Sequence, residues 1–218
     1  MPHPTPVRIY AGTQEGLFVW RSRNESRENV SVGFQTGTID AIDGLRSKPN
    51  VVYLGVTQDG LYRTDDGGES WRRVFEGNVR AVTVDSTDER VIYVGVEPIH
   101  LYRSENGGKS WEELAGVQAL PAEVKKKWSY PRPPHREHVR HVFVHPDDCS
   151  LIYVCLEHGG IIRSSDRGKS WERLSVETLT AFTRDRDADI GFSADTESAA
   201  RRNASTDNVR SPSRRFCD

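Results

Sequence analysis

The chain has few cysteines, no long apolar run and no surplus of basic residues. Its 218 residues include 30 Lys and Arg and 32 Asp and Glu, which gives a formal net charge of −2. Without excess positive charge to displace the counterions of phosphates, we expect no nucleic-acid partner. No segment approaches the ~18 apolar residues of a membrane span, so we expect no membrane partner either.

Cysteine occurs three times, at Cys149, Cys155 and Cys217. Such an odd and sparse set argues against a disulfide framework and favours free thiols in a reducing cytoplasm. A local bridge between Cys149 and Cys155, which lie close in sequence, is the alternative. Residues 1–6 have no basic region followed by an apolar core, so we predict a disordered N-terminus rather than a secretory signal. These features predict a cytoplasmic protein.

The chain does contain a repeat. A segment of the form Ser/Thr-x-Asp/Asn-x-Gly-x-x-Trp occurs at 64–71, 104–111 and 164–171, each time after the same strand-like phrases. The tyrosines of the first phrase, at 10, 53, 93 and 153, are spaced by 43, 40 and 60 residues. A supersecondary unit that recurs at such a period predicts a repeat architecture.

Each repeat contains four short runs rich in Val, Ile and Tyr, separated by turn formers and not interrupted by a helical pattern. Four antiparallel strands every ~40 residues are typical of a β-propeller blade. We therefore predict an all-β fold, a β-propeller of four-stranded antiparallel blades. The predicted strands are 39–42, 79–84 and 139–144 for the first position, 9–12, 52–55, 92–95 and 152–155 for the second, 16–18, 60–63, 100–103 and 160–163 for the third, and 71–75, 111–114 and 171–174 for the fourth.

The repeat predicts an incomplete ring of about four blades, an open arc. Residues 7–176 hold the blades, with an inserted loop at 117–137, and the first unit has no box. Residues 177–218 form a degenerate blade remnant or a disordered tail, in which 178–183 could be an inner strand. Open blade edges would allow self-association.

The three octapeptides resemble Asp-box (BNR) repeats, which occur in sialidases, xyloglucanases and the luminal domain of sortilin. The residues themselves describe a hairpin turn between strands three and four, in which the acid accepts backbone N–H groups and the glycine takes positive φ. An alternative, calcium or catalytic ligation by these acids, is not needed to explain the spacing. The resemblance also implies that the boxes lie on the face away from an active site. The predicted structural residues are Thr64, Asp66, Gly68, Trp71, Ser104, Asn106, Gly108, Trp111, Ser164, Asp166, Gly168 and Trp171.

The inserted loop marks the face on which we expect a function, because long insertions on one face carry function more often than short turns do. Its segment 128–131, together with 138–140 and 157–160, is similar to motifs of a group of uncharacterised Asp-box propellers; the likeness covers residues 8 to 174 approximately. It implies a fold and a face rather than a reaction. A proline-stiffened loop with packed aromatics is the alternative. The predicted ligand-binding residues are Arg80, Arg140, Trp128, Tyr130, His138, Glu157 and His158.

We predict a non-catalytic binding or scaffold module that needs no cofactor and whose ligand is a carbohydrate or a protein. The alternative is a glycoside hydrolase of sialidase or xyloglucanase type, or an inactive relative, with Glu97 and Glu157 as its acid pair. Residues 7–10, Val-Arg-Ile-Tyr, lack the aromatic residue and the proline of the sialidase motif. We predict no metal, since side chains alternate along a strand and would turn His138 and His141 opposite ways.

Overall fold

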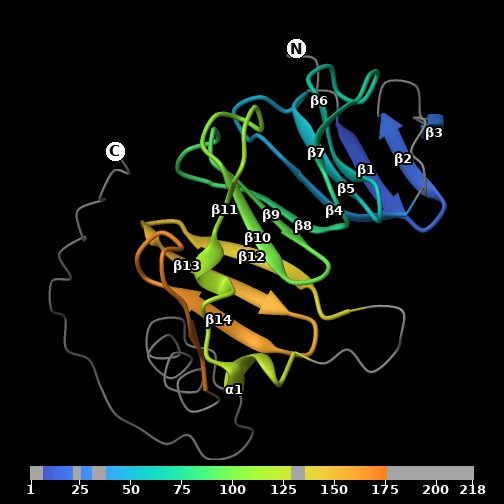
Figure 1. Ribbon diagram of the computed structural model, residues 1–218. Coiled ribbons are helices and arrows are strands. Elements are labelled where there is room, and N and C mark those ends of the chain that lie inside the picture. Colours follow the sequence, from blue (N-terminus) through green and yellow to red (C-terminus); the bar gives the residue numbers. More distant parts are fainter. Residues whose placement is uncertain (1–6, 22–25, 31–37, 129–135, 176–218) are drawn as a thin grey trace, which may run out of the picture.

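The computed structural model describes residues 7–21, 26–30, 38–128 and 136–175. The predicted N-terminal segment 1–6 and tail 177–218 lie outside these ranges, as does the middle of the inserted loop, so the predicted domain limits are not tested. Within the described ranges, the chain folds into four antiparallel sheets that follow one another along the sequence (Figure 1).

Each sheet is one blade, and its strands pair in sequence order. The first blade has three strands and the other three blades have four each. The strands are β1 (Arg8–Thr13), β2 (Gly16–Arg21) and β3 (Ser26–Val30); β4 (Ile39–Gly44), β5 (Val52–Val56), β6 (Gly60–Thr64) and β7 (Arg72–Glu76); β8 (Val79–Val84), β9 (Ile92–Val96), β10 (His100–Ser104) and β11 (Glu112–Glu113); and β12 (Val139–His145), β13 (Asp148–Leu156), β14 (Gly160–Ser164) and β15 (Glu172–Arg173).

The prediction of an open propeller is confirmed. The inner strands β4, β8 and β12 contact one another in turn, and β1 contacts β4. Among the described residues, no comparable contact joins the fourth blade to the first, so the arc does not close. In the described part of the chain, the first blade has no inner strand, because its β1 aligns with the second strand of the other blades. The inserted loop adds two short helices that the sequence pattern did not predict, η1 (Ala115–Val117) and α1 (Ala122–Lys125).

The hydrophobic core lies between the blades. Strand alternation sends Val52 and Leu54 of β5 toward Leu17 and Val19 of the first blade, while Tyr53 packs toward the third. The same pattern recurs between the third and fourth blades, where the buried cluster is the largest. The second and third blades therefore bury both faces against neighbours, and the first and fourth blades bury one face each; a single blade, without neighbours, would leave both faces exposed.

The expectation of free cysteines is wrong for Cys149, which is disulfide-bonded. Cys155 is free, so the local bridge between the two is wrong as well. Residue counts alone could not reveal this pairing, because it depends on where the chain brings its cysteines together. In the described part of the chain, no helix is long and apolar enough to cross a membrane.

Candidate functional site

A β-bulge interrupts each of the three inner strands at the same place. The pairing register shifts between Ile39 and Ala41 and likewise between Val79 and Ala81. The third shift lies between Val139 and His141. The extra residues are Asp40, Arg80 and Arg140, at equivalent positions near one end of the blades. A bulge turns a side chain away from the regular pleat, and bulges are common beside binding and active sites.

Each bulge residue contacts the residue that follows the second strand of its own blade. The hydroxyl of Thr57 donates to Asp40 Oδ2 at 2.6 Å, and Arg80 Nε donates to Glu97 Oε2 at 2.9 Å. In the fourth blade, Arg140 Nε lies 2.9 Å from Glu157 Oε2. We call these three contacts the rim pairs, and this end of the blades the rim.

A backbone contact fixes the geometry of each rim pair. The N–H of Thr57 donates to the carbonyl of Thr38 at 3.0 Å. The N–H groups of Glu97 and Glu157 donate to the carbonyls of residues 78 and 138 at 3.0 and 3.1 Å. The three pairs therefore sit on one recurring backbone frame, and the side chains on that frame differ from blade to blade.

The rim opens into a pocket of about 540 Å³ with only polar lining residues. Four of the predicted ligand-binding residues line it: Arg80, His138, Arg140 and Glu157. The lining residues are Gln14, Thr38, Asp40, Thr57, Arg80, His138, Arg140 and Glu157. Such a surface presents both charges and several hydrogen-bonding groups, so it suits a polar ligand rather than an apolar one.

Arg80 is enclosed by two carboxylates. Its side chain is 10% exposed, and it forms ion pairs with Asp40 of the preceding blade and with Glu97, the latter at 2.5 Å. Burial by itself lowers the pKa of Arg80, but the hydrogen bonds to Glu97 and Asp40 outweigh it and raise the pKa. Arg80 therefore stays charged and ties the second blade to the third.

Glu97 is held in its ionised form. Burial alone would raise its pKa, but the Arg136 N–H, the hydrogen bond and charge of Arg80, and the charge of His138 together lower it. The Arg136 N–H donates to Glu97 Oε1 at 2.8 Å, and His138 Nδ1 lies 3.8 Å from Glu97 Oε2. A general acid needs a raised pKa, so Glu97 is poorly suited to protonate a leaving group.

Arg140 lies in a more open environment than its repeat equivalent Arg80. Its side chain is 52% exposed, and that of its partner Glu157 is 29% exposed. The guanidinium therefore retains access to solvent and to a ligand in the pocket, whereas the Arg80 guanidinium is enclosed. An accessible guanidinium can bind a carboxylate or a hydroxyl through its several N–H donors.

The aromatic residues of the inserted loop do not line this pocket. Trp128 is half-buried against the core of the fourth blade, and its indole contacts the Gly159 region. Tyr130 lies outside the described residues. Trp128 instead borders a separate cavity of about 420 Å³ together with His100 and Glu137. Trp128 therefore packs against the fourth blade, as the alternative of a loop with packed aromatics predicts, and does not present an exposed flat surface to a ligand in the rim pocket.

The turn that holds His158 is fastened to the start of β12. Oε1 of the buried Glu137 accepts the N–H groups of His158 and Gly159 at 2.5 and 3.1 Å. His158 Nδ1 also lies 3.5 Å from Glu137 Oε2. His158 is therefore not among the lining residues of the rim pocket, although it follows Glu157 in sequence.

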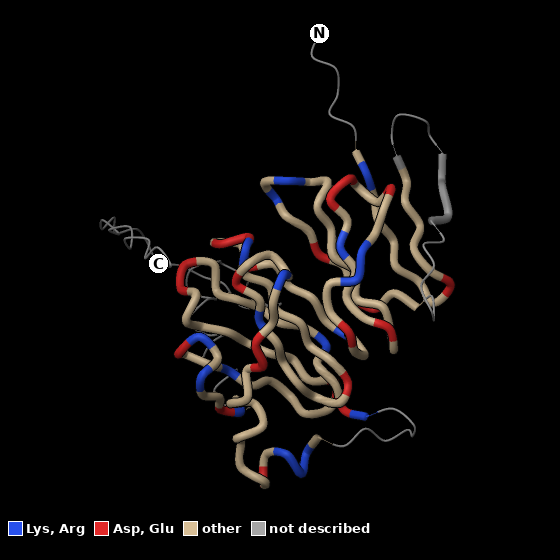
Figure 2. The backbone as a smooth tube through the Cα atoms, turned by 45° about the horizontal axis from the view of Figure 1, so that its top comes forward, with Lys and Arg blue, Asp and Glu red and all other residues tan. Residues whose placement is uncertain are grey.

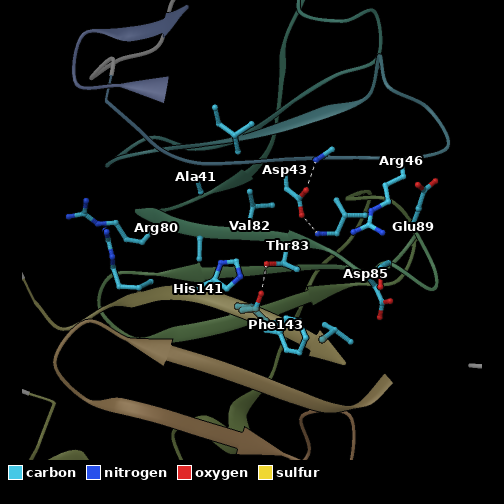
Figure 3. A pocket seen from close by; sticks show the side chains of 18 of the residues that line it. Ala41, Asp43, Arg46, Arg80, Val82, Thr83, Asp85, Glu89, His141 and Phe143 are labelled. Atoms are coloured by element: carbon cyan, nitrogen blue, oxygen red, sulfur yellow. Dashed lines mark hydrogen bonds between the residues drawn. The ribbon is translucent and has the colours of Figure 1, made fainter. Parts of the chain in front are cut away.

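A second pocket of about 540 Å³ runs along the concave face of the arc, below the rim (Figure 3). Its walls are the inner strands, which are cross-linked by polar contacts. Asp43 Oδ2 accepts the Val84 N–H at 2.7 Å, and the Thr83 hydroxyl donates to the Val142 carbonyl at 2.7 Å. Phe143 is 45% exposed here. This groove corresponds to the channel of a closed propeller.

The Asp-box turns lie at the opposite end of the blades. Asp66 Oδ1 accepts the N–H groups of Glu69 and Ser70 at 3.0 Å each, and the Thr64 hydroxyl oxygen accepts the Gly68 N–H at 2.9 Å. Asn106 accepts the equivalent N–H groups in the second box. Gly68, Gly108 and Gly168 all have positive φ, at +96°, +84° and +87°. The carboxylates are thus occupied within their own turns.

The tryptophans that end the boxes pack inward. Trp111 donates its indole N–H to the Val74 carbonyl of the preceding blade at 2.9 Å, and Trp171 donates to Gly168 within its own turn at 3.0 Å. Trp71 packs against the core between the first and second blades. Tyrosines of the preceding blades reach the same turns: Tyr53 donates its hydroxyl to the Gly107 carbonyl at 3.2 Å.

Among the described residues, no group of three or more His, Cys, Asp or Glu side chains could hold a metal ion. The expected alternation of side chains is interrupted in β12, however, because the bulge at Arg140 changes the phase and leaves Val139 and Val142 both buried. His138 is 4% exposed, and His141 is exposed on the concave face. The prediction of no metal stays a prediction.

Asp40 and Thr57 line the rim pocket but were not among the predicted site residues. Both could have been found, because Asp40 aligns with Arg80 and Arg140 at the second residue of each inner strand, and Thr57 aligns with Glu97 and Glu157. They were missed because the prediction followed arginines and glutamates that recur between repeats, and the residues at these two positions differ in the second blade.

Basic and acidic residues are interspersed along the described chain (Figure 2).

Comparisons with known proteins agree with this architecture. A model of the BNR-Asp box repeat matches residues 161–174, which span β14 and the third box. A search among curated proteins found no match. The chain is similar in structure to the GH74 xyloglucanase from Xanthomonas campestris, with 19% identity and a TM-score of 0.62, covering 79% of this chain and 29% of that one. It is also similar to the GH74 enzyme from Niastella koreensis, with 16% identity and a TM-score of 0.56, covering 78% of this chain and 28% of that one.

The chain thus spans less than a third of the length of these structures, and at such identities the likeness concerns the fold alone. The repeated hairpin turns, the four successive sheets and these similarities identify the described part of the chain as an open four-blade arc with the β-propeller fold, in which residues 161–174 match the BNR-Asp box repeat.

Proposed function

We propose that the chain is a non-catalytic binding module that takes a polar ligand, a carbohydrate or a protein segment, in the rim pocket. The observation that carries this proposal is the series of three bulges, which turns Asp40, Arg80 and Arg140 toward one pocket. The extra residue of a bulge is not paired in the strand ladder, so its side chain can point toward a binding site.

Within the pocket, Arg140 and Glu157 are the ligand-contacting pair. They are the more exposed of the two charged rim pairs, and they are bound to each other at 2.9 Å. A ligand that offers a hydroxyl or an amide can bind both groups at once, since it donates to the carboxylate and accepts from the guanidinium. Arg80 and Asp40 form the floor and keep the pocket in shape.

The alternative, a glycoside hydrolase, requires one carboxyl group that is protonated near neutral pH. Glu97 is held ionised by Arg80 and by the Arg136 N–H, which opposes that role. The similarity to GH74 enzymes concerns the fold, and a fold does not determine an activity. It therefore gives little support to a role in polysaccharide hydrolysis. We therefore place the hydrolase second.

A glycan array, a peptide array and a panel of chromogenic glycosides test the two functions on the same protein. The binding module predicts retention of a ligand without turnover, and loss of retention in Arg140→Ala. Arg90→Ala is the matched control, since Arg90 is an exposed arginine paired with Asp88 outside the rim. Turnover that disappears in Glu157→Gln would instead establish the hydrolase.

A further inference from the structure

The first blade presents an open outer face, which we call the leading face. In the β1–β2 register, Ile9 lies opposite Trp20 and Ala11 lies opposite Phe18, so these four side chains share that face. Ile9 is 54% exposed and Ala11 is exposed. The repeat equivalents of Ile9 and Ala11 in the second blade are Val52 and Leu54, which are only 5% and 0% exposed.

The fourth blade presents the complementary face, which we call the trailing face. The register of β12, β13 and β14 places Phe143, Tyr153 and Arg163 in one row and His141, Cys155 and Ile161 in the next. Phe143 is 45% exposed. Tyr93 and Leu101, which occupy the positions of Tyr153 and Ile161 in the third blade, are 2% and 1% exposed between blades.

The two open faces are therefore the two halves of an interface that the chain forms three times internally. We call each contact between two successive blades a joint. At every joint inside the chain, the trailing face of one blade packs onto the leading face of the next. A surface that matches both halves is present on another copy of this chain, and its fit follows from the repeat itself.

The inner strand β4 is less covered than its repeat equivalents. Ile42 of β4 is 36% exposed, whereas its repeat equivalents Val82 and Val142 are 6% and 0% exposed. β8 packs against the preceding inner strand β4, and β12 packs against β8, but among the described elements no inner strand precedes β4, and β1 packs against it instead. The start of the arc therefore leaves part of the second blade uncovered.

We propose that two copies of this chain associate head to tail and close an eight-blade ring. Four sheets per copy give eight in the pair, within the four to eight blades that propellers have. The trailing face of each copy meets the leading face of the other, and a two-fold axis along the channel relates the two joints. Both rim pockets then face the same side, although the ring does not depend on the proposed binding function.

The mass of the full chain in solution is the first test. Sedimentation velocity and light scattering over a range of concentrations should show one species of twice the monomer mass, without higher polymers, because both joints close. A monomer at all concentrations, or an open series of polymers, would overturn the ring.

Single-face variants test the joint itself. Ile9→Glu on the leading face and Phe143→Glu on the trailing face should each raise the dissociation constant of the dimer by about thirty-fold or more, as expected for a charge in a packed joint. Circular dichroism should stay unchanged, because both side chains are exposed in the single chain. Arg90→Glu, at an exposed site away from both faces, is the control and should remain dimeric.

An equimolar mixture of the two variants separates a head-to-tail joint from a symmetric one. The Ile9→Glu copy keeps its trailing face and the Phe143→Glu copy keeps its leading face, so the mixture should form a heterodimer through one intact joint. A mixture that stays as monomeric as each variant alone would contradict the head-to-tail arrangement.

Discussion

The two ends of the blades repeat in different ways. At the box end, three turns form nearly the same hydrogen bond: the hydroxyl oxygens of Thr64, Ser104 and Ser164 each accept the N–H of the glycine four residues later. At the rim end, the three bulges share a backbone frame, but the side chains on it change from an Asp–Thr pair to two Arg–Glu pairs. One end repeats its side chains, and the other repeats only its backbone.

This difference shows that a motif can recur conspicuously in a sequence because it stabilises the fold, without a part in binding or catalysis. The box residues recur because each turn needs the same acceptor and the same positive φ. The rim residues vary because the backbone alone fixes their place, which leaves the side chains available for contacts that differ from blade to blade. Within the rim, Arg80 is enclosed by two carboxylates and Arg140 is half exposed, so equivalent positions need not have equivalent roles.

The largest effect should come from Arg80→Met. The variant leaves Asp40 and Glu97 close together without their shared cation, and breaking such a buried pair costs about 3–5 kcal/mol of unfolding free energy. Urea unfolding at pH 7 measures the loss. Because the folded pKa of Glu97 is lowered from 4.5, the contribution of this carboxylate is present above pH 4.5 and is lost as pH falls through the folded pKa. The deficit of the variant should therefore shrink in acid, and an unchanged deficit at pH 3 would contradict the pairing.

A smaller effect is expected from Thr64→Val in the first box. The substitution keeps the shape but leaves the buried Gly68 N–H without its acceptor, at a cost of about 1–3 kcal/mol. Thr57→Val at the rim is the counterpart, and we expect about 1 kcal/mol or less, because Asp40 keeps its ion pair with Arg80. Equal losses measured by urea unfolding would show that the two ends do not differ as described.

Asp166→Asn should change the pH dependence more than the stability at pH 7. The hydrogen bonds of Ser170 lower the pKa of Asp166 to about 2, so its contribution is present above pH 3.8 and is lost as pH falls toward 2. Asn106 accepts the same N–H groups in the second box without a charge. Melting temperatures at pH 7 and pH 2.5 should therefore differ less in the variant than in the parent chain.

The smallest effect on stability should come from Arg140→Met. This exposed pair with Glu157 contributes about 0–1 kcal/mol, so urea unfolding should remain close to that of the parent chain. The comparison with Arg80→Met uses the same substitution at the equivalent position. A loss as large as that of Arg80→Met would mean that both arginines hold the blades together and that neither is available to a ligand.

Much of the fold could be predicted from the sequence, because strands of a propeller repeat at a fixed period. The predicted inner strands at 79–84 and 139–144 coincide with β8 and with β12 to within one residue. The prediction missed β3 (Ser26–Val30), whose polar sequence has no strand-like alternation, and the helix at Ala122–Lys125. Neighbouring strands determine β3, and local propensity does not.

The candidate site was less predictable. Arg80, Arg140 and Glu157 were found because they align between repeats, and His138 was found from the motif at 138–140; the structure places all four around one pocket. Trp128 was expected at the surface of the loop but packs on the fourth blade. The bulges themselves have no sequence signal here, since they arise from the pairing of β4, β8 and β12 with their neighbours.

The sequence by itself determined the blade, its period and the box turns, because alternation and turn chemistry act over a few residues. Only the tertiary structure decided that Arg80 is enclosed while Arg140 is open, that Ile9 and Phe143 remain exposed at the two ends, and that Cys149 is bonded while Cys155 is free. These properties depend on which blade lies beside which, and burial and ion pairing follow from neighbours that are far apart in the chain.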